Sequence, residues 1–321
     1  MPVIRVPLLL GLLPIACSSS LDPRAITVEE RRVSPTVANA HVTAFTDDHF
    51  IWLPAASIAT ANRIMLLLPG TGGAPANARM IGKVAAQQGY RAIGLMYPDS
   101  RAVVTECAAD PDVACMANMR EEIVEGRDLS SHVSVDAENS IAGRLADLLR
   151  HLAHAYPDER WDMFLQSDGT VRWDAIAVAG LSQGGGHAAY IARLHAVPRV
   201  VMFGAPADGF GGVKAPWMEI AATMAERYYG FRHVRDPFLS IDANWSALGL
   251  AVFGAAVNVT AETRDFRGSH TFTTDLLPAT GSYADAHPSV FGDGAAPMTA
   301  AGTPVFDSLW RYLFGTPPPP P

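Results

Sequence analysis

The densest structural signal lies in the stretch Asp174-Ala-Ile-Ala-Val-Ala-Gly-Leu-Ser-Gln-Gly-Gly-Gly-His-Ala-Ala189. Its apolar run over 174–180 is typical of a buried strand, and a helix is expected over 187–196. A glycine-rich turn separates the two, and a second apolar run, 199–204, follows the helix directly. Because two buried strands joined through a helix run parallel, this segment predicts the core of a parallel sheet.

Strand-like and helical patterns also alternate through the rest of the chain. This alternation predicts one α/β domain over residues 27–315, with a mostly parallel central sheet, helices on both faces and an inserted cap at 208–250. Residues 98–137 and 161–173 are expected to be irregular connections. The expected strands lie near 27–33, 41–53, 63–68, 91–96, 251–259 and 271–277, and the other expected helices near 76–88, 140–155 and 304–314.

Composition and charge exclude several classes of protein. Of the 321 residues, 49% are hydrophobic and 17% are charged, which excludes intrinsic disorder. The formal net charge of −8 provides no attraction to nucleic acid or to an anionic membrane surface. No run of the sequence reaches the roughly 18 uninterrupted apolar residues that a membrane-spanning helix requires.

The amino terminus has the pattern of an export signal. One arginine precedes an apolar run over 6–16, which ends at Cys17 and three serines. The end of this run resembles the lipobox of bacterial lipoproteins, although Pro14 stands where a leucine is usual. Residues 1–17 therefore predict an exported bacterial protein, lipid-anchored at the cell envelope through Cys17 or cleaved and secreted, with membrane contact only through that anchor. The proline tail at 316–321 is expected to be stiff polyproline.

Two further cysteines, Cys107 and Cys115, lie eight residues apart in the loop-like stretch CAADPDVAC. In an exported protein this spacing predicts a disulfide that closes a short surface loop. No histidine or additional cysteine stands at ligand spacing, so no zinc site is expected. The sequence likewise indicates no other metal and no cofactor.

The turn after the 174–180 strand matches the pattern G-x-S-x-G, as Gly180-Leu-Ser-Gln-Gly184. Such a turn lifts the serine hydroxyl above the sheet and directs a helix N-terminus at a bound oxyanion. Ser182 is therefore the candidate nucleophile. The alternative is a structural or phosphate-binding turn, but no G-x-G-x-x-G opens a first strand-helix unit, as dinucleotide binding would require.

An oxyanion hole needs two backbone N–H groups, one of them on the residue after the nucleophile, here Gln183. The second is expected in Leu68-Pro-Gly-Thr-Gly-Gly73, which follows the 63–68 strand. Thr71 is the first candidate and Gly72 the next. The alternative is a tight turn that binds nothing.

With these motifs, the chain resembles the α/β-hydrolase superfamily over residues 27–315. More narrowly, it is similar to a group of secreted bacterial α/β-hydrolases. The resemblance implies an α/β-hydrolase fold and a serine nucleophile, with the catalytic residues in the chain order serine, acid, histidine. The segments that carry the narrower resemblance are LLLPGTGG at 66–73, GLSQGGGHAA at 180–189, GAPADG at 204–209, NWSALGL at 244–250 and VFDSLWRYLFG at 305–315.

The expected base and acid follow from this order. His287 follows the last strand-like run and precedes the final helix, so it is the favoured base, with His270 as the alternative. Asp208 leaves the buried 199–204 strand through glycine and proline, and it is the favoured acid. Asp265 and Asp236 are the alternatives. The acid would fix the histidine tautomer and stabilise the imidazolium ion.

These residues predict a serine hydrolase that cleaves carboxylic esters, small-molecule or polymeric, through an acyl-enzyme on Ser182. Acyl transfer or amide hydrolysis would use the same residues. The aromatic residues of 208–250 would form either a lid over the site or the core of the cap. The alternative from another class is a surface lipoprotein that keeps the fold as a non-catalytic binding scaffold.

Overall fold

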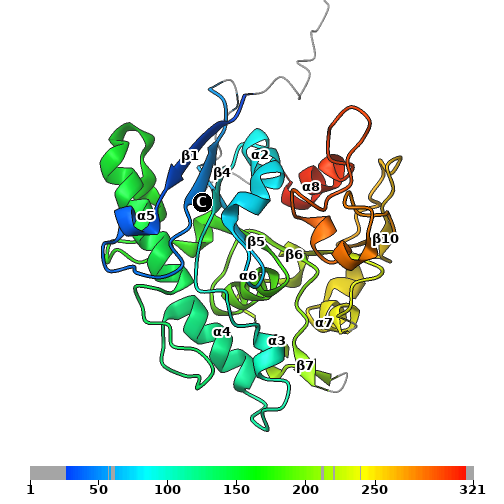
Figure 1. The fold of residues 1–321 in the computed structure, drawn as a ribbon, viewed down its shortest axis with the longest axis horizontal. Coiled ribbons are helices and arrows are strands. Elements are labelled where there is room, and N and C mark those ends of the chain that lie inside the picture. The colour runs from blue at the N-terminus through cyan, green and yellow to red at the C-terminus, as the bar shows by residue number, and fades with distance from the viewer. Residues whose placement is uncertain are drawn as a thin grey trace, which may run out of the picture.

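The computed structural model describes residues 27–56, 58, 62–210, 213–219, 221–238 and 240–315. Figure 1 shows these residues as a central sheet with helices around it. The expected signal sequence with Cys17 and the proline tail at 316–321 lie outside the described residues.

Within the described ranges, nine strands form one sheet in the order β1-β2-β4-β3-β5-β6-β9-β11-β10. β2 runs antiparallel to both of its neighbours, and every other neighbouring pair is parallel. The predicted α/β class with a mostly parallel central sheet is therefore confirmed. The strands are β1 (Glu29–Val33), β2 (His49–Leu53), β3 (Ile64–Leu68), β4 (Arg91–Gly94), β5 (Ile176–Leu181), β6 (Val200–Phe203), β9 (Tyr228–His233), β10 (Val257–Asn258) and β11 (Thr271–Thr274). A separate two-stranded antiparallel sheet contains β7 (Gly209–Phe210) and β8 (Val213–Lys214).

Among the helices of the described chain, none is long and apolar enough to cross a membrane. The α-helices are α1 (Pro35–Ala38), α2 (Arg79–Gln87), α3 (Val103–Glu106), α4 (Cys115–Glu125), α5 (Ile141–Ala155), α6 (Gln183–Leu194), α7 (Ile241–Ala247) and α8 (Asp307–Phe314). Short 3-10 turns occupy Pro75–Ala78, Pro157–Glu159, Trp161–Phe164, Trp173–Ala175, Pro216–Glu219, Ala225–Arg227, Leu250–Phe253, Tyr283–Asp285 and Pro288–Val290.

Alternate residues of the central strands face two separate apolar cores. In β3, Leu66 and Leu68 belong to one core, whereas Met65 and Leu67 belong to the other. Helices α4, α5 and α6 cover the first core, and α2 and α8, which lie side by side in Figure 1, cover the second. Both faces of the sheet are therefore buried, which is why its central strands are almost continuously apolar.

Several elements differ from the sequence-based expectation. β9 lies inside the segment 208–250 that was expected to be an inserted cap, and it is an interior strand of the sheet, paired with β6 and β11. The expected strand at 251–259 is instead a 3-10 turn followed by the two-residue β10. Helix α4 occupies part of a segment expected to be irregular. Its polar residues Arg120 and Glu122 are buried, so its buried surface does not follow an apolar pattern.

Candidate active site

Ser182 lies in a sharp turn between β5 and α6. Its backbone has φ 54° and ψ −119°, a left-handed conformation that is strained for a residue with a side chain. The motif glycines make this turn possible: a Cβ on Gly180 would overlap the backbone of Gly184, and a Cβ on Gly184 would overlap the carbonyl oxygens of Leu68 and Pro69. The turn therefore brings Ser182 against the loop that follows β3.

The loop at 69–73 lies directly beside Ser182, because a Cβ placed on Gly70 would come within 3.2 Å of the serine Cβ. The Thr71 hydroxyl donates a hydrogen bond of 3.2 Å to Gln183 Oε1, which joins the two predicted oxyanion residues. Among the described residues, the backbone N–H groups of Thr71 and Gln183 have no hydrogen-bond acceptor, whereas the N–H of Gly72 donates to the Asp99 carbonyl oxygen at 3.1 Å. Thr71, rather than Gly72, therefore retains a free donor for an oxyanion.

His287 pairs with Asp236. Its Nδ1 lies 2.6 Å from Asp236 Oδ2, and because an ionised carboxylate only accepts, Nδ1 carries the proton. The second carboxylate oxygen, Oδ1, accepts a hydrogen bond of 3.0 Å from the backbone N–H of Phe238. With Nδ1 protonated, Nε2 of the neutral ring is an acceptor, and it is buried without a partner among the described residues.

The His287–Asp236 pair lies close to Ser182. Gly204, at the end of β6, has φ 56°, and a Cβ there would come within 2.8 Å of His287 Cε1 and 2.9 Å of Asp236 Oδ2. The preceding residue, Phe203, accepts a hydrogen bond of 2.8 Å from the Ser182 N–H. The Phe238 ring contacts the His287 ring edge-on at 5.1 Å and also lines the pocket that contains Ser182.

Asp236 reaches this position because β9 is a strand of the parallel sheet. β5, β6, β9 and β11 are parallel, so residues that follow their carboxyl ends gather at one edge. His233, the last residue of β9, fixes the loop that carries the acid. Its Nδ1 accepts from the Arg235 N–H at 2.9 Å, and its Nε2 donates to the Leu276 carbonyl at 2.9 Å. The sequence did not favour Asp236 because strand β9 was not predicted. Asp236 nevertheless lies between Ser182 and His287 in the chain, so it satisfies the order serine, acid, histidine.

Asp208, the favoured acid, pairs with a different residue. It is fully buried, and both of its oxygens accept hydrogen bonds from Arg120, with Nε at 2.6 Å. The Trp217 indole N–H donates to the same carboxylate at 3.0 Å. Asp208 does leave β6 at the expected edge, but the buried guanidinium binds its carboxylate, so Asp236 and not Asp208 holds His287. Arg120 also donates to the Gln183 carbonyl oxygen at 3.3 Å, which ties this ion pair to the start of α6.

The other candidate base and acid lie elsewhere. His270 immediately precedes β11, at the sheet edge opposite Ser182, where it is stacked between Tyr229 and Phe253 and its Nδ1 bonds to the Tyr228 carbonyl. Burial lowers the pKa of His270. Asp265 is exposed, and within the described part of the chain its carboxylate accepts only a local hydrogen bond, from the backbone N–H of Arg267.

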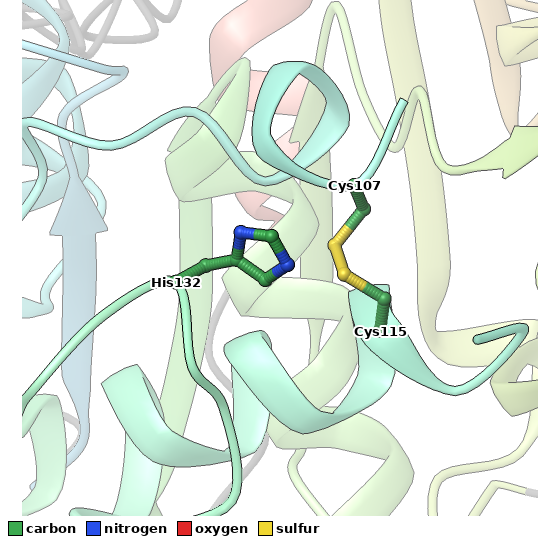
Figure 2. A group of neighbouring side chains, drawn as sticks. All are labelled: Cys107, Cys115 and His132. Atoms are coloured by element: carbon green, nitrogen blue, oxygen red, sulfur yellow. A yellow bond between two sulfur atoms is a disulfide. The ribbon is translucent and has the colours of Figure 1, made fainter. Parts of the chain in front are cut away.

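The predicted disulfide is confirmed, with Cys107 following α3 and Cys115 opening α4. Figure 2 shows the imidazole of His132 beside it, and the potential ligand atoms of the three residues lie within 4.8 Å of one another. Because metals bind cysteine as a thiolate, the bonded sulfurs offer no ligand in this state. His132 Nε2 instead pairs with Asp110 at 2.7 Å.

A small pocket of about 70 Å³ opens at Ser182. Its polar lining consists of Thr71, Thr105, Arg120, Ser182 and Gln183, and its apolar lining comes from Ala102, Val103, Val104, Ala207 and Phe238. Ser182, Thr71 and Gln183 therefore line one cavity, and the His287 ring contacts Phe238 in the cavity wall. Such an arrangement can attack a carbonyl carbon and stabilise the resulting oxyanion.

Asp99 supports the loop at 69–73 from inside the protein. Its side chain is 1% exposed, and Oδ2 has no partner among the residues described. Burial raises the pKa of the Asp99 carboxyl to about 7. The Asp99 backbone oxygen accepts a hydrogen bond from the Gly72 N–H. A negative charge on the Asp99 side chain would therefore form close to the loop at 69–73.

A scan against protein-family models found no match to the chain, and a search of curated proteins also found no match.

Proposed function

We propose that this protein is a serine hydrolase with an α/β-hydrolase fold that cleaves carboxylic esters. The observation that carries this proposal is the pairing of His287 with Asp236 beside Ser182. Ser182 itself lies on a turn whose strained conformation is possible because of the motif glycines. The order Ser182, Asp236, His287 along the chain also agrees with the resemblance to that superfamily. A non-catalytic scaffold has no need of such a turn or of an oriented histidine.

In the proposed reaction, Ser182 Oγ attacks the ester carbonyl carbon while its proton passes to His287 Nε2. The carbonyl electron pair moves to the oxygen, which the N–H groups of Thr71 and Gln183 would hold. Collapse of this intermediate breaks the bond to the alcohol, and the alcohol oxygen takes the proton from His287. Asp236 stabilises the imidazolium ion in between.

The acyl-enzyme is then hydrolysed by the same groups in reverse order. A water molecule gives a proton to His287 Nε2 as its oxygen attacks the acyl carbon. Ser182 Oγ leaves and recovers the proton, and a carboxylic acid is released. If the protein is exported, as residues 1–17 suggest, its substrates are esters outside the cytoplasm.

The proposal is tested by hydrolysis of p-nitrophenyl acetate, butyrate and octanoate, with Ser182→Ala beside the parent. Ser134→Ala is a matched control, because Ser134 is exposed and lies outside the pocket. We expect turnover that Ser182→Ala abolishes and Ser134→Ala retains. A fluorophosphonate should modify Ser182 alone, as shown by peptide mass spectrometry. A folded protein that neither hydrolyses any of these esters nor reacts with the fluorophosphonate would favour the scaffold interpretation.

A further inference from the structure

We infer that the acyl group of the substrate is short and apolar, of about two to four carbon atoms. This inference rests on the proposed function and deepens it, because it concerns the group that Ser182 would carry as an acyl-enzyme. Three properties of the pocket support it: its position at the nucleophile, its volume and the rigidity of its walls.

The position of the pocket identifies it as the acyl site. Thr71, Ser182 and Gln183 all line it. A carbonyl carbon bonded to Ser182 Oγ, with its oxygen at the Thr71 and Gln183 N–H groups, therefore lies at this pocket. The substituent that remains bonded to that carbon throughout the reaction is the acyl chain, and the apolar lining from Val104 and Phe238 suits a hydrocarbon.

The volume limits the length of that chain. An apolar cavity of about 150 Å³ accommodates benzene, which corresponds to about 25 Å³ per carbon atom. At this scale the pocket of about 70 Å³ holds roughly three carbon atoms. Acetyl, propionyl and butyryl groups therefore fit or nearly fit, whereas most of an octanoyl chain would have to lie outside.

The inner end of the pocket resists enlargement. Arg120 is 2% exposed and lines the pocket, so it closes the side that faces the protein interior. Its guanidinium is bound to the fully buried Asp208 and to the Gln183 carbonyl oxygen. Displacing it would separate a buried ion pair, which is costly because each charge would lose its partner away from water.

The side walls are also fixed. The Val103 N–H donates a hydrogen bond of 3.0 Å to Gln183 Oε1, which ties α3 to the start of α6. The disulfide of Cys107 follows α3 immediately and joins it to α4. Phe238, which also lines the pocket, is held by the hydrogen bond from its backbone N–H to Asp236 Oδ1 and by the contact of its ring with His287.

The test compares kcat/KM for p-nitrophenyl acetate, butyrate and octanoate across three variants of the full chain. For the parent we expect at least about a tenfold fall from butyrate to octanoate, the order of loss that overpacking a filled site produces. Val104→Ala should raise the octanoate-to-acetate ratio several-fold, because Val104 is a half-buried wall residue. Ala207→Leu should lower butyrate relative to acetate. Val113→Ala, at an exposed valine outside the pocket, should leave both ratios unchanged.

A second measurement separates failure of this inference from failure of the proposed function. The rate at which Ser182 is phosphonylated by methyl- and octyl-phosphonofluoridates is followed by mass spectrometry, since the alkyl group on phosphorus takes the place of the acyl chain. Faster labelling by the methyl reagent supports the short pocket even if no ester is turned over. Ester hydrolysis that rises or stays level from acetate to octanoate overturns the inference while the proposed function stands. A folded protein that reacts with neither reagent class overturns both.

Discussion

Replacing Asp236 with asparagine is the sharpest perturbation that the site allows. Asp236 Oδ1 accepts the Phe238 N–H at 3.0 Å, and this contact requires an acceptor. In the variant the amide oxygen would keep this position, and the amide NH₂ would face His287 Nδ1, 2.6 Å away in the parent. A donor there makes Nδ1 the acceptor and moves the ring proton to Nε2. His287 then has no free electron pair to take the Ser182 proton.

The expected loss follows from this wrong tautomer. In a serine protease with a Ser-His-Asp triad, the same change lowers kcat about 10⁴-fold, which corresponds to about 5 kcal/mol of transition-state stabilisation. For Asp236→Asn we expect a loss of kcat of about 10³- to 10⁴-fold on p-nitrophenyl acetate, with KM changed little. Residual activity is expected, because the oxyanion donors and Ser182 remain.

Two other aspartates serve as controls. Asp265→Asn, at an exposed aspartate whose carboxylate bonds to the Arg267 N–H rather than to His287, should retain kcat within about twofold. Asp208→Asn breaks the buried pair with Arg120, so its main effect should be a loss of unfolding free energy of about 3–5 kcal/mol, measured by urea denaturation. The reasoning is refuted if folded Asp236→Asn retains kcat within tenfold of the parent, or if folded Asp208→Asn shows the larger kcat loss.

Three further changes have defined outcomes. Gly204→Ala should abolish most esterase activity, because its Cβ would come within 2.9 Å of His287 Nδ1 and the backbone has φ 56°; wild-type kcat/KM in a folded variant would contradict this. Burial raises the pKa of Asp99 to about 7. Between about pH 4 and 7 the folded state therefore binds more protons than the unfolded state, so the free energy of unfolding should fall as pH rises through this range. Asp99→Asn should flatten that fall in urea titrations at pH 5 and 7, and an unchanged slope would exclude Asp99 as its source. Opening the disulfide by the paired change Cys107→Ser and Cys115→Ser should lower the unfolding free energy by about 2–3 kcal/mol, as measured against the parent under non-reducing conditions, and equal stability would contradict the entropic reasoning.

The local signals around Ser182 were sufficient to predict much of the fold. The pattern of strand, glycine turn and helix predicted β5, α6 and β6, because each of these is encoded by residues adjacent in sequence. The start of α6 was expected at His187 but lies at Gln183, since the motif glycines form the first turn of the helix rather than a loop before it. The steric requirement for those glycines arises from tertiary contacts with the loop after β3.

The aspartate that pairs with His287 could not be predicted from the sequence. Asp208 and Asp236 both leave strands of the sheet at the same edge, and both precede His287, so a local pattern cannot separate them. What separates them is a partner distant in sequence. Arg120, brought in by α4, binds both oxygens of Asp208 inside the protein and leaves Asp236 as the carboxylate that faces His287.

The sequence alone therefore determined the class of the fold, the position of Ser182, the cysteine pair and the placement of His287 after the last long strand-like run. Each of these follows from composition, from residue spacing or from the order of residues along the chain. Only the tertiary structure decided which aspartate holds His287, which loop N–H remains free and how large the pocket at Ser182 is. These depend on hydrogen-bond partners and packing between residues far apart in the chain, as Arg120 with Asp208 illustrates, and no local pattern encodes such a choice.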